Sequence, residues 1–381
     1  MKKAKVLVSL LLVAGLLLTF PVHKAQAVLD DVNAKAAVLM EAGTGTILYE
    51  KNAHERRASG SVTKVMSLLL IMEALDSGQI TLEDQVTTSE FANSMGGSEI
   101  WLEVGEVMTV DDLLKAVAVQ SANDATVALA EHVAGSEAAF LEMMNNKAAE
   151  LGMQDTHFLN TTGFDEEGQY TSAYDIALMA RELIKHEKIF EYSGIWMTEL
   201  RGGKTELANT NKLLKTYQGI TGLKTGTTDD AGNCFCGTAQ RGDLKLISVV
   251  LGCETSKDRF NATTTLLDYG FDNWSVATPS LEEGAIQPVP VLNGMQTQVQ
   301  GIVELDQVML VSKGQEGNIT HEVVMAENVE APVEKGQVLG KVVYKLGEQE
   351  LCAFPIKAAE AVEPITFGAA IHTLFIGLLG L

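Results

Sequence analysis

Three short stretches of the chain carry side chains that could act together in acyl transfer. They are Ser61-Val62-Thr63-Lys64, Ser121-Ala122-Asn123 and Lys224-Thr225-Gly226-Thr227. Each alone is a weak signal, because a Ser-x-x-Lys pair arises by chance about once in a chain of this length. The chain has one Ser-x-x-Lys and one Ser-x-Asn, and only one of its three Lys-Thr pairs is followed by glycine. We therefore interpret the three stretches as parts of one site.

The spacing of Ser61 and Lys64 predicts that hydroxyl and amine meet. Residues three apart lie on one face of a helix, so the two side chains are neighbours if the helix starts at Ser61. A lysine can take the serine proton only if its pKa falls from about 10.4 towards about 7 or 8. Burial against the apolar residues 62–75, the helix N-terminus and Lys224 as a second cation would all lower that pKa. The alternative is an N-capping serine beside a solvated lysine.

The middle motif precedes a predicted helix that starts at Asp124. The Ser121 hydroxyl could relay a proton between Lys64 and a leaving amine, and the Asn123 amide could hold a peptide carbonyl. Asp124 is expected to stabilise the helix start rather than to react. A plain helix cap is the alternative interpretation of these residues.

The third motif falls in a predicted strand, where Gly226 lets another backbone approach closely. If that strand lies at the edge of the sheet, it can pair with an extended peptide. Lys224 and Thr225 would then meet a terminal carboxylate, and the backbone N–H groups of Ser61 and Thr227 could form an oxyanion hole. A turn-adjacent strand with a surface lysine is the alternative.

The elements that must position these motifs follow the pattern strands, helices, strands. Residues 36–49 predict a hairpin around a Gly-containing turn, and 62–75 predict a helix that is buried almost all round. Because the terminal strands can share one sheet with the helices against it, the fold class is α/β of the α+β type, with an antiparallel sheet flanked by helices. Further helices are expected at 111–119, 124–134, 136–152 and 172–186, and an antiparallel meander at 223–227, 234–239 and 245–253.

The chain divides into four predicted parts. Residues 1–27 have a basic start, an apolar stretch and a small-residue cleavage site, which is typical of a secretory signal peptide. Residues 28–275 form the domain that carries the motifs. Residues 276–361 are rich in Val, Gly and Pro without a helical period, which predicts a small all-β domain. Residues 362–381 form an apolar tail.

Composition narrows the choice of partners. The formal net charge is -22, and removing the four lysines of residues 1–27 changes it from 28 minus 50 to 24 minus 50, which is -26. Nucleic acid is therefore excluded as a partner, since its binding depends on clustered Lys and Arg. The cysteines are too few for a disulfide scaffold and complete no zinc pattern, so we expect them to be small buried residues: Cys234, Cys236, Cys253 and Cys352.

The tail predicts a membrane-seeking helix. Residues 365–381 carry no formal charge, and small residues recur at spacings of three or four. This leaves larger apolar residues on another face: Phe367, Ile371, Leu374, Phe375 and Leu378. Seventeen helical residues span only about 25 Å, and the basic residues usual in interfacial helices are missing. A buried C-terminal helix is the alternative.

The three motifs in this order are the signature of penicillin-binding proteins and class A β-lactamases. Longer phrases resemble the low-molecular-mass D-alanyl-D-alanine carboxypeptidases, and they run from about residue 33 to 274: ASGSVTKVMSLLLIMEAL, SANDATVALAEHVAGSEAAF, LGMQDTHFLNTTG, YTSAYDIALMARELI, ITGLKTGTTDDAGNCF and LLDYGF. The resemblance implies a serine-peptidase domain, a β-rich domain and a membrane-associating tail. It implies an exported enzyme at the outer face of the cytoplasmic membrane or in the cell wall.

The resemblance also implies the substrate and the site. The substrate would be a peptidoglycan stem peptide ending in D-Ala-D-Ala, penicillins would be covalent inhibitors, and no metal or organic cofactor is expected. Carried over motif by motif, Ser61 is the acylated nucleophile and Lys64 its base. The remaining residues complete the middle motif and the substrate strand: Ser121, Asn123, Lys224, Thr225, Gly226 and Thr227.

The chain departs from the β-lactamases in two respects. Ala122 stands where many of them have Asp, and Glu166 and Glu167 are not followed by the Glu-x-x-Leu-Asn pattern used in deacylation. A secreted serine β-lactamase is nevertheless one alternative function. A catalytically silent wall-binding or sensor module is another.

Overall fold

The computed structural model describes residue 29 and residues 32–379. The predicted signal peptide at 1–27 lies outside the described residues and stays a prediction.

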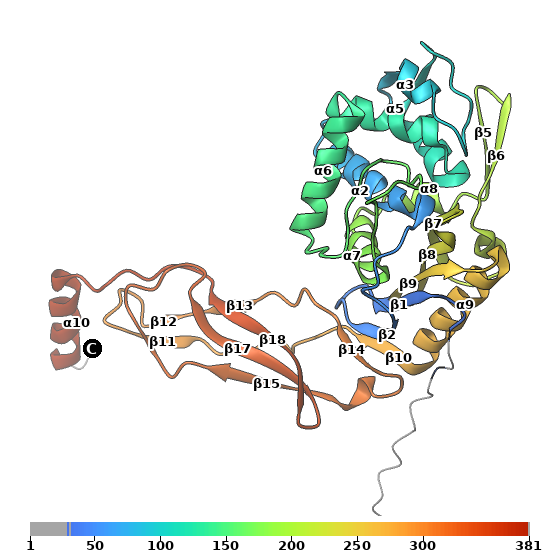
Figure 1. Cartoon of the computed structure of the whole chain (residues 1–381). Helices are drawn as coiled ribbons and strands as arrows, with labels where there is room; N and C mark the ends of the chain where they lie inside the picture. The colour runs from blue at the N-terminus through green and yellow to red at the C-terminus, as the bar shows by residue number, and fades with distance from the viewer. Residues whose placement is uncertain (1–28, 30–31, 380–381) are drawn as a thin grey trace, which may run out of the picture. The chain divides into compact units, whose positions relative to one another are not determined.

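A five-stranded antiparallel sheet forms the centre of the first domain (Figure 1). Its strand order is β2-β1-β9-β8-β7, so strands from the two ends of the domain pair through β1 and β9. The predicted hairpin and meander are confirmed, and the Lys-Thr-Gly strand lies at an edge of the sheet, which meets the condition for pairing with a peptide. The strands are β1 (Ala36–Glu41), β2 (Ile47–Lys51), β7 (Ile220–Thr228), β8 (Gly232–Arg241) and β9 (Leu244–Cys253).

Helices cover both faces of this sheet, as the alternation of side chains along β1 shows. Leu39 lies near Gly270 of helix α9 (Ser256–Asn273), whereas Val38 and Met40 belong to the core on the opposite face. That core includes α2 (Lys64–Asp76), which is buried on nearly every side as predicted. The other predicted helices are present as α5 (Asn123–Ala134), α6 (Glu137–Glu150) and α7 (Ala173–Leu183).

The structure corrects two predicted helices. The helix expected to start at Ser61 begins at Lys64, after a 3₁₀ turn over Gly60–Thr63. The helix expected at 111–119 is α-helical only in α4 (Val110–Lys115) and continues as a π turn over Ala116–Gln120. Both irregular turns end beside a motif residue, and such turns concentrate at functional sites because they re-aim side chains there.

Several elements were not predicted. The long helix α9 follows the sheet meander, and short hairpins and helical turns join the longer elements. These are β3 (Gln85–Thr87), α3 (Glu90–Asn93), β4 (Val107–Thr109), α8 (Ile189–Ser193), β5 (Met197–Leu200), β6 (Thr205–Ala208) and a 3₁₀ turn (Lys212–Lys215). Elements of three to five residues are too short for a hydrophobic period to be recognised.

The second domain is all-β apart from one 3₁₀ turn (Glu316–Asn318). Strand β10 (Trp274–Ala277) pairs with β14 (Met309–Ser312), and β15 (Ile319–Met325), β17 (Val338–Leu346), β18 (Gln349–Ala358) and β13 (Gly301–Val303) form a four-stranded sheet. A three-stranded sheet contains β12 (Gln298–Val299), β11 (Val289–Leu292) and β16 (Val329–Glu330). Valines such as Val289, Val299 and Val342 fill the cores, which explains the Val-rich sequence.

The tail forms helix α10 (Phe367–Leu379). Phe367, Ile371 and Phe375 are exposed and recur every four residues, so they lie on one face as predicted. Among the helices of the described part, none combines the length and apolarity needed to cross a bilayer. All four cysteines are unpaired; Cys352 is half-buried and the other three are buried, in agreement with the prediction for those three.

Candidate active site

The first two motifs meet at the amine of Lys64. Its Nζ atom lies 2.9 Å from Ser61 Oγ and 2.6 Å from Asn123 Oδ1, although 59 residues separate Lys64 from Asn123. A third contact of 2.8 Å joins the amine to the carbonyl oxygen of Thr162. The side chain of Lys64 is 0% exposed, so the alternative of a solvated first-turn lysine is wrong.

The 3₁₀ turn before α2 explains why Ser61 and Lys64 face each other. In such a turn the side chains at i and i+3 eclipse, which brings the hydroxyl over the amine more directly than an α-helix would. Ser59 rather than Ser61 precedes the turn, and no side-chain cap bond forms there. The Ser61 hydroxyl is therefore not used as a helix cap.

In the structure the Lys64 amine donates to Ser61 Oγ and to the carbonyl oxygens of Asn123 and Thr162. When the amine is neutral, it has two N–H donors and one lone pair. The two carbonyl oxygens can then accept both hydrogens, which leaves the lone pair for the hydroxyl hydrogen of Ser61. Burial, followed by the positive charge of Lys224, lowers the pKa of Lys64 well below its usual value, and Asp124 opposes this shift.

The π turn over Ala116–Gln120 delivers the middle motif to the site. It ends at Ser121, whose backbone is left-handed with φ 68°. Ser121 Oγ is buried and has no hydrogen-bond partner within the described residues, so it is available for another group. Asn123 begins α5, and its amide nitrogen donates to the carbonyl of Gly96.

Asp124 has a wider role than the predicted stabilisation of the helix start. Its buried carboxylate accepts from the backbone N–H of Ala125, which lies in the first turn of α5. It also accepts from the N–H groups of Ile100 and Leu102. The carboxylate thus fixes the neighbouring loop to the middle motif.

The third motif lies against the 3₁₀ turn because Gly226 has no side chain. A Cβ atom at Gly226 would overlap the carbonyl oxygen of Ser59 and lie 3.0 Å from the Ser61 nitrogen. Conversely, a Cβ at Gly60 would lie 3.0 Å from the Thr227 nitrogen. The backbone nitrogens of Ser61 and Thr227 are thereby brought to the same part of the site.

Arg259 supports this strand from α9 and was not identified from the sequence. Its guanidinium donates to the carbonyl of Gly226 and to the hydroxyl of Thr227, both at 2.9 Å. Burial of Lys224 itself, followed by the positive charge of Arg259, lowers the pKa of Lys224 to about 7. Arg259 is itself buried. Lys224 is 1% exposed, so the alternative of a surface lysine is wrong.

A loop before α7 closes the site from another side. The carbonyl oxygen of Thr161 accepts a hydrogen bond from the Ser67 hydroxyl. The carbonyl oxygen of Thr162 accepts one from the Lys64 amine. Asn160 accepts from the backbone N–H of Gly163, which folds the loop into a tight turn. These residues belong to the phrase LGMQDTHFLNTTG, which contributed to the sequence analysis only through its resemblance to the carboxypeptidases. The contact of Thr162 with Lys64 was not predicted.

Replacing Gly163 with alanine should destabilise the protein strongly. Gly163 has φ +89°, and an added Cβ would overlap the carbonyl of Gly60. Backbone strain and overpacking together predict a loss of about 2 to 4 kcal/mol in the free energy of unfolding, measured by urea denaturation. Gly135→Ala is the matched control, because Gly135 has φ +81° but open space around it. Equal losses at the two positions would contradict the close backbone contact.

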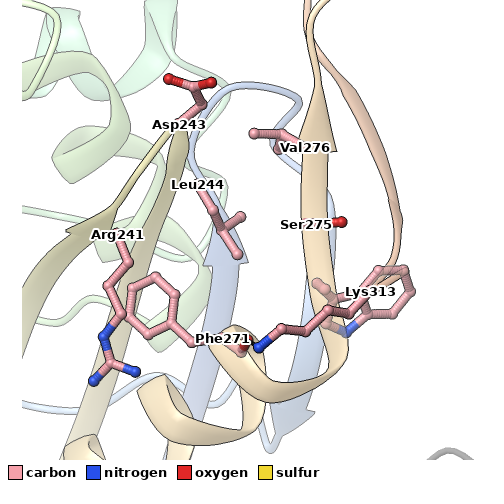
Figure 2. A pocket seen from close by; sticks show the side chains of 8 residues that line it. Arg241, Asp243, Leu244, Phe271, Ser275, Val276 and Lys313 are labelled. Carbon is pink, nitrogen blue, oxygen red and sulfur yellow. Dashed lines mark hydrogen bonds between the residues drawn. The ribbon is translucent and has the colours of Figure 1, made fainter. Parts of the chain in front are cut away.

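A pocket of about 240 Å³ lies apart from these residues (Figure 2). Its lining includes Arg241, Phe271 and Lys313, and none of the predicted site residues. The cations are already engaged: Lys313 Nζ donates to the Phe271 carbonyl at 2.8 Å, and Arg241 lies 4.3 Å from the centre of the Phe271 ring. Across the described part of the chain, no group of three His, Cys, Asp or Glu residues is arranged to hold a metal ion.

The chain is similar to known proteins over most of its length. The sequence matches the D-alanyl-D-alanine carboxypeptidase family over residues 22–255. D-alanyl-D-alanine carboxypeptidase DacF of Bacillus subtilis is 43% identical over 374 residues, covering 95% of this chain and 96% of the relative. The chain belongs to this carboxypeptidase family. It is accordingly a serine-type peptidase by family.

Solved structures extend the similarity to both domains. Residues 279–364 match the C-terminal domain of penicillin-binding protein 5. Penicillin-binding protein 5 of Haemophilus influenzae superposes with a TM-score of 0.77 at 31% identity, covering 87% of this chain and 98% of the other. Penicillin-binding protein D2 of Listeria monocytogenes, solved in its ampicillin-bound form, has a TM-score of 0.58 at 33% identity and covers 63% of this chain and 98% of its own.

Proposed function

We propose that the protein removes the terminal D-alanine from peptidoglycan peptides that end in D-Ala-D-Ala, through an acyl-enzyme on Ser61. The observation that carries the proposal is the fully buried Lys64 amine within 2.9 Å of the Ser61 hydroxyl. The relatives are carboxypeptidases of this specificity by name. They do not favour a β-lactamase or a silent wall-binding module.

In the acylation step, Ser61 Oγ attacks the carbonyl carbon between the two terminal D-alanines. Lys64 takes the hydroxyl proton, which is favoured because burial and the charge of Lys224 lower its pKa well below the usual value. The Ser121 hydroxyl, buried and without a bonding partner in the described chain, passes a proton to the leaving amine. The C–N bond breaks, D-alanine leaves, and the acyl group stays on Ser61 until water hydrolyses it.

Electrostatic stabilisation comes from the contact between β7 and the 3₁₀ turn. The nitrogens of Ser61 and Thr227, which lie near one another across Gly60 and Gly226, donate to the oxyanion. The edge of β7 that does not face β8 pairs with the substrate backbone, and the terminal carboxylate is met by Lys224 and Thr225. The pKa of Lys224 near 7 rises when a carboxylate arrives, because the anion favours the charged amine.

Penicillins react at the same serine. Attack by Ser61 opens the β-lactam C–N bond, and the ring keeps the leaving amine attached, so the adduct is retained. The ampicillin-bound Listeria structure supports this proposal for a similar fold.

The location follows from the substrate. Peptidoglycan lies outside the cytoplasmic membrane, so we propose that residues 1–27 direct export. The apolar face of α10, with Phe367, Ile371 and Phe375 exposed, would lie on the outer face of the cytoplasmic membrane and bury apolar area at the lipid interface.

The decisive experiment measures both reactions on the purified protein. The protein should release D-alanine from an N-acylated pentapeptide ending in D-Ala-D-Ala. After treatment with benzylpenicillin, the intact mass of the protein should increase by one benzylpenicillin, with the adduct on the peptide that contains Ser61. Rapid penicillin hydrolysis without D-alanine release would instead indicate a β-lactamase. Peptide binding without any adduct would indicate a silent module.

A further inference from the structure

An indole side chain stands in solvent on the loop that precedes β4. Trp101 is 74% exposed, and its backbone is left-handed with φ 54°. A bulky residue in that conformation is uncommon and is kept only where the surroundings impose it. Exposed tryptophans held in this way are typical of binding surfaces.

The backbone on both sides of Trp101 is fixed. The N–H groups of Ile100 and Leu102 donate to the same Asp124 carboxylate, at distances of 3.0 to 3.2 Å. Arg201, at the turn of the β5–β6 hairpin, donates to the carbonyls of Ile100 and Trp101 at 2.9 and 3.4 Å. The indole is therefore presented at a defined position, which reduces the entropy lost when a ligand binds it.

The same loop is bonded directly to the middle motif. The Asn123 N–H donates to the Ser98 carbonyl at 2.6 Å, and Ser98 Oγ donates to the Gln120 carbonyl at 2.7 Å. Ser98 thus contacts Gln120, just before Ser121, and Asn123, two residues after it. An open hollow of about 680 Å³ begins on this loop, lined by Trp101, Val104 and Arg201 among others.

We propose that Trp101 forms a substrate subsite for the stem-peptide residues that precede the two terminal D-alanines. This inference rests on the proposed function. The loop is attached to the active site at Ser98, and three residues span at most about 10 Å. Three residues of an extended peptide span the same distance, so the part of the substrate just before the scissile bond can reach the indole.

The contact would be made by the apolar parts of that peptide against the indole face. Trp101 offers a large flat surface whose burial favours binding, and Val104, 55% exposed, extends it. A dipeptide or a penicillin is too short to reach this surface. The subsite would therefore distinguish long wall peptides from small acyl donors.

The test compares Trp101→Ala with the unchanged full-length chain on three substrates: an N-acetylated D-Ala-D-Ala dipeptide, the free pentapeptide and the disaccharide pentapeptide. For both pentapeptides kcat/KM should fall by about 10-fold, chiefly through KM. For the dipeptide, kcat/KM should change by less than about 2-fold, and so should the rate of acylation by benzylpenicillin. Neither molecule reaches the indole, so neither should respond to its removal. Trp101→Phe should retain most of the activity on the pentapeptides, because it keeps a flat aromatic face.

Val338→Ala is the control for removing an exposed apolar side chain, since Val338 is 61% exposed in the all-β domain. Equal losses on short and long substrates, or no loss on any, would overturn the subsite. A loss confined to the disaccharide substrate would show that a sugar, not the peptide, contacts the indole. If the unchanged protein itself neither released D-alanine nor bound penicillin, the proposed function would fail instead.

Discussion

Ser61→Ala should abolish both D-alanine release and the penicillin adduct. The substitution removes the atom that forms the acyl bond, so the turnover number should fall by at least about 10⁴-fold. The fold should survive, because the Lys64 amine keeps its bonds to Asn123 and Thr162. Intact mass after penicillin treatment and D-alanine release are the two measurements, and thermal unfolding checks the fold.

Ser77→Ala is the matched control for this prediction. Ser77 caps the other end of α2, where its hydroxyl donates to the carbonyl of Ala74. That variant should be acylated at the unchanged rate. Acylation of Ser61→Ala at the unchanged rate would place the nucleophile elsewhere and remove the basis of the proposed mechanism.

Lys64→Met and Lys64→Arg should both slow acylation by about 10² to 10⁴-fold, the usual contribution of a general base. Methionine has no basic nitrogen, and arginine cannot give up its proton in a protein. Because both variants change a buried group, their folding must be checked by thermal unfolding. Lys185→Met is the control, since Lys185 is largely exposed on the surface in an ion pair with Glu182.

The pH dependence distinguishes loss of a base from general damage. The pKa of Lys64 is lowered by burial and by Lys224, and the base is active only when neutral. The acylation rate of the unchanged protein should therefore be lost as the pH falls through that pKa and should rise towards a plateau above it. The residual rate of Lys64→Met should lack this rise. A variant that kept the same pH profile would show that another group is the base.

Much of the site could be predicted because its motifs obey local rules. The i, i+3 spacing of Ser61 and Lys64 holds in a 3₁₀ turn as well as in an α-helix, so the pair survives the error in the helix start. The short apolar runs separated by turns predicted the meander of β7, β8 and β9, and the structure places Lys224 on its edge strand. These features depend on residues that are close together in the sequence, so one sequence is enough to predict them.

The rest of the site depends on contacts between residues far apart in the chain. Thr162 reaches Lys64 through a carbonyl oxygen, which every residue has, so no side chain marks it. Arg259 was missed together with α9, although the capping box of Thr255 and Asp258 was a readable helix start. The left-handed conformation of Trp101 is imposed by Asp124 and Arg201, and nothing local to Trp101 indicates it.

The position of β7 at the edge of the sheet affects the tendency of the protein to aggregate in solution. In the described part of the chain no second strand pairs with this edge, and unpaired edges are where sheet proteins associate into aggregates. The middle of β7, from Gly222 to Gly226, is buried, so its ends are the parts open to another copy. The excess of 50 acidic over 28 basic residues counters this, because copies with that balance repel one another. We expect colloidal stability to decrease with added salt, which screens the repulsion and leaves the edge unchanged.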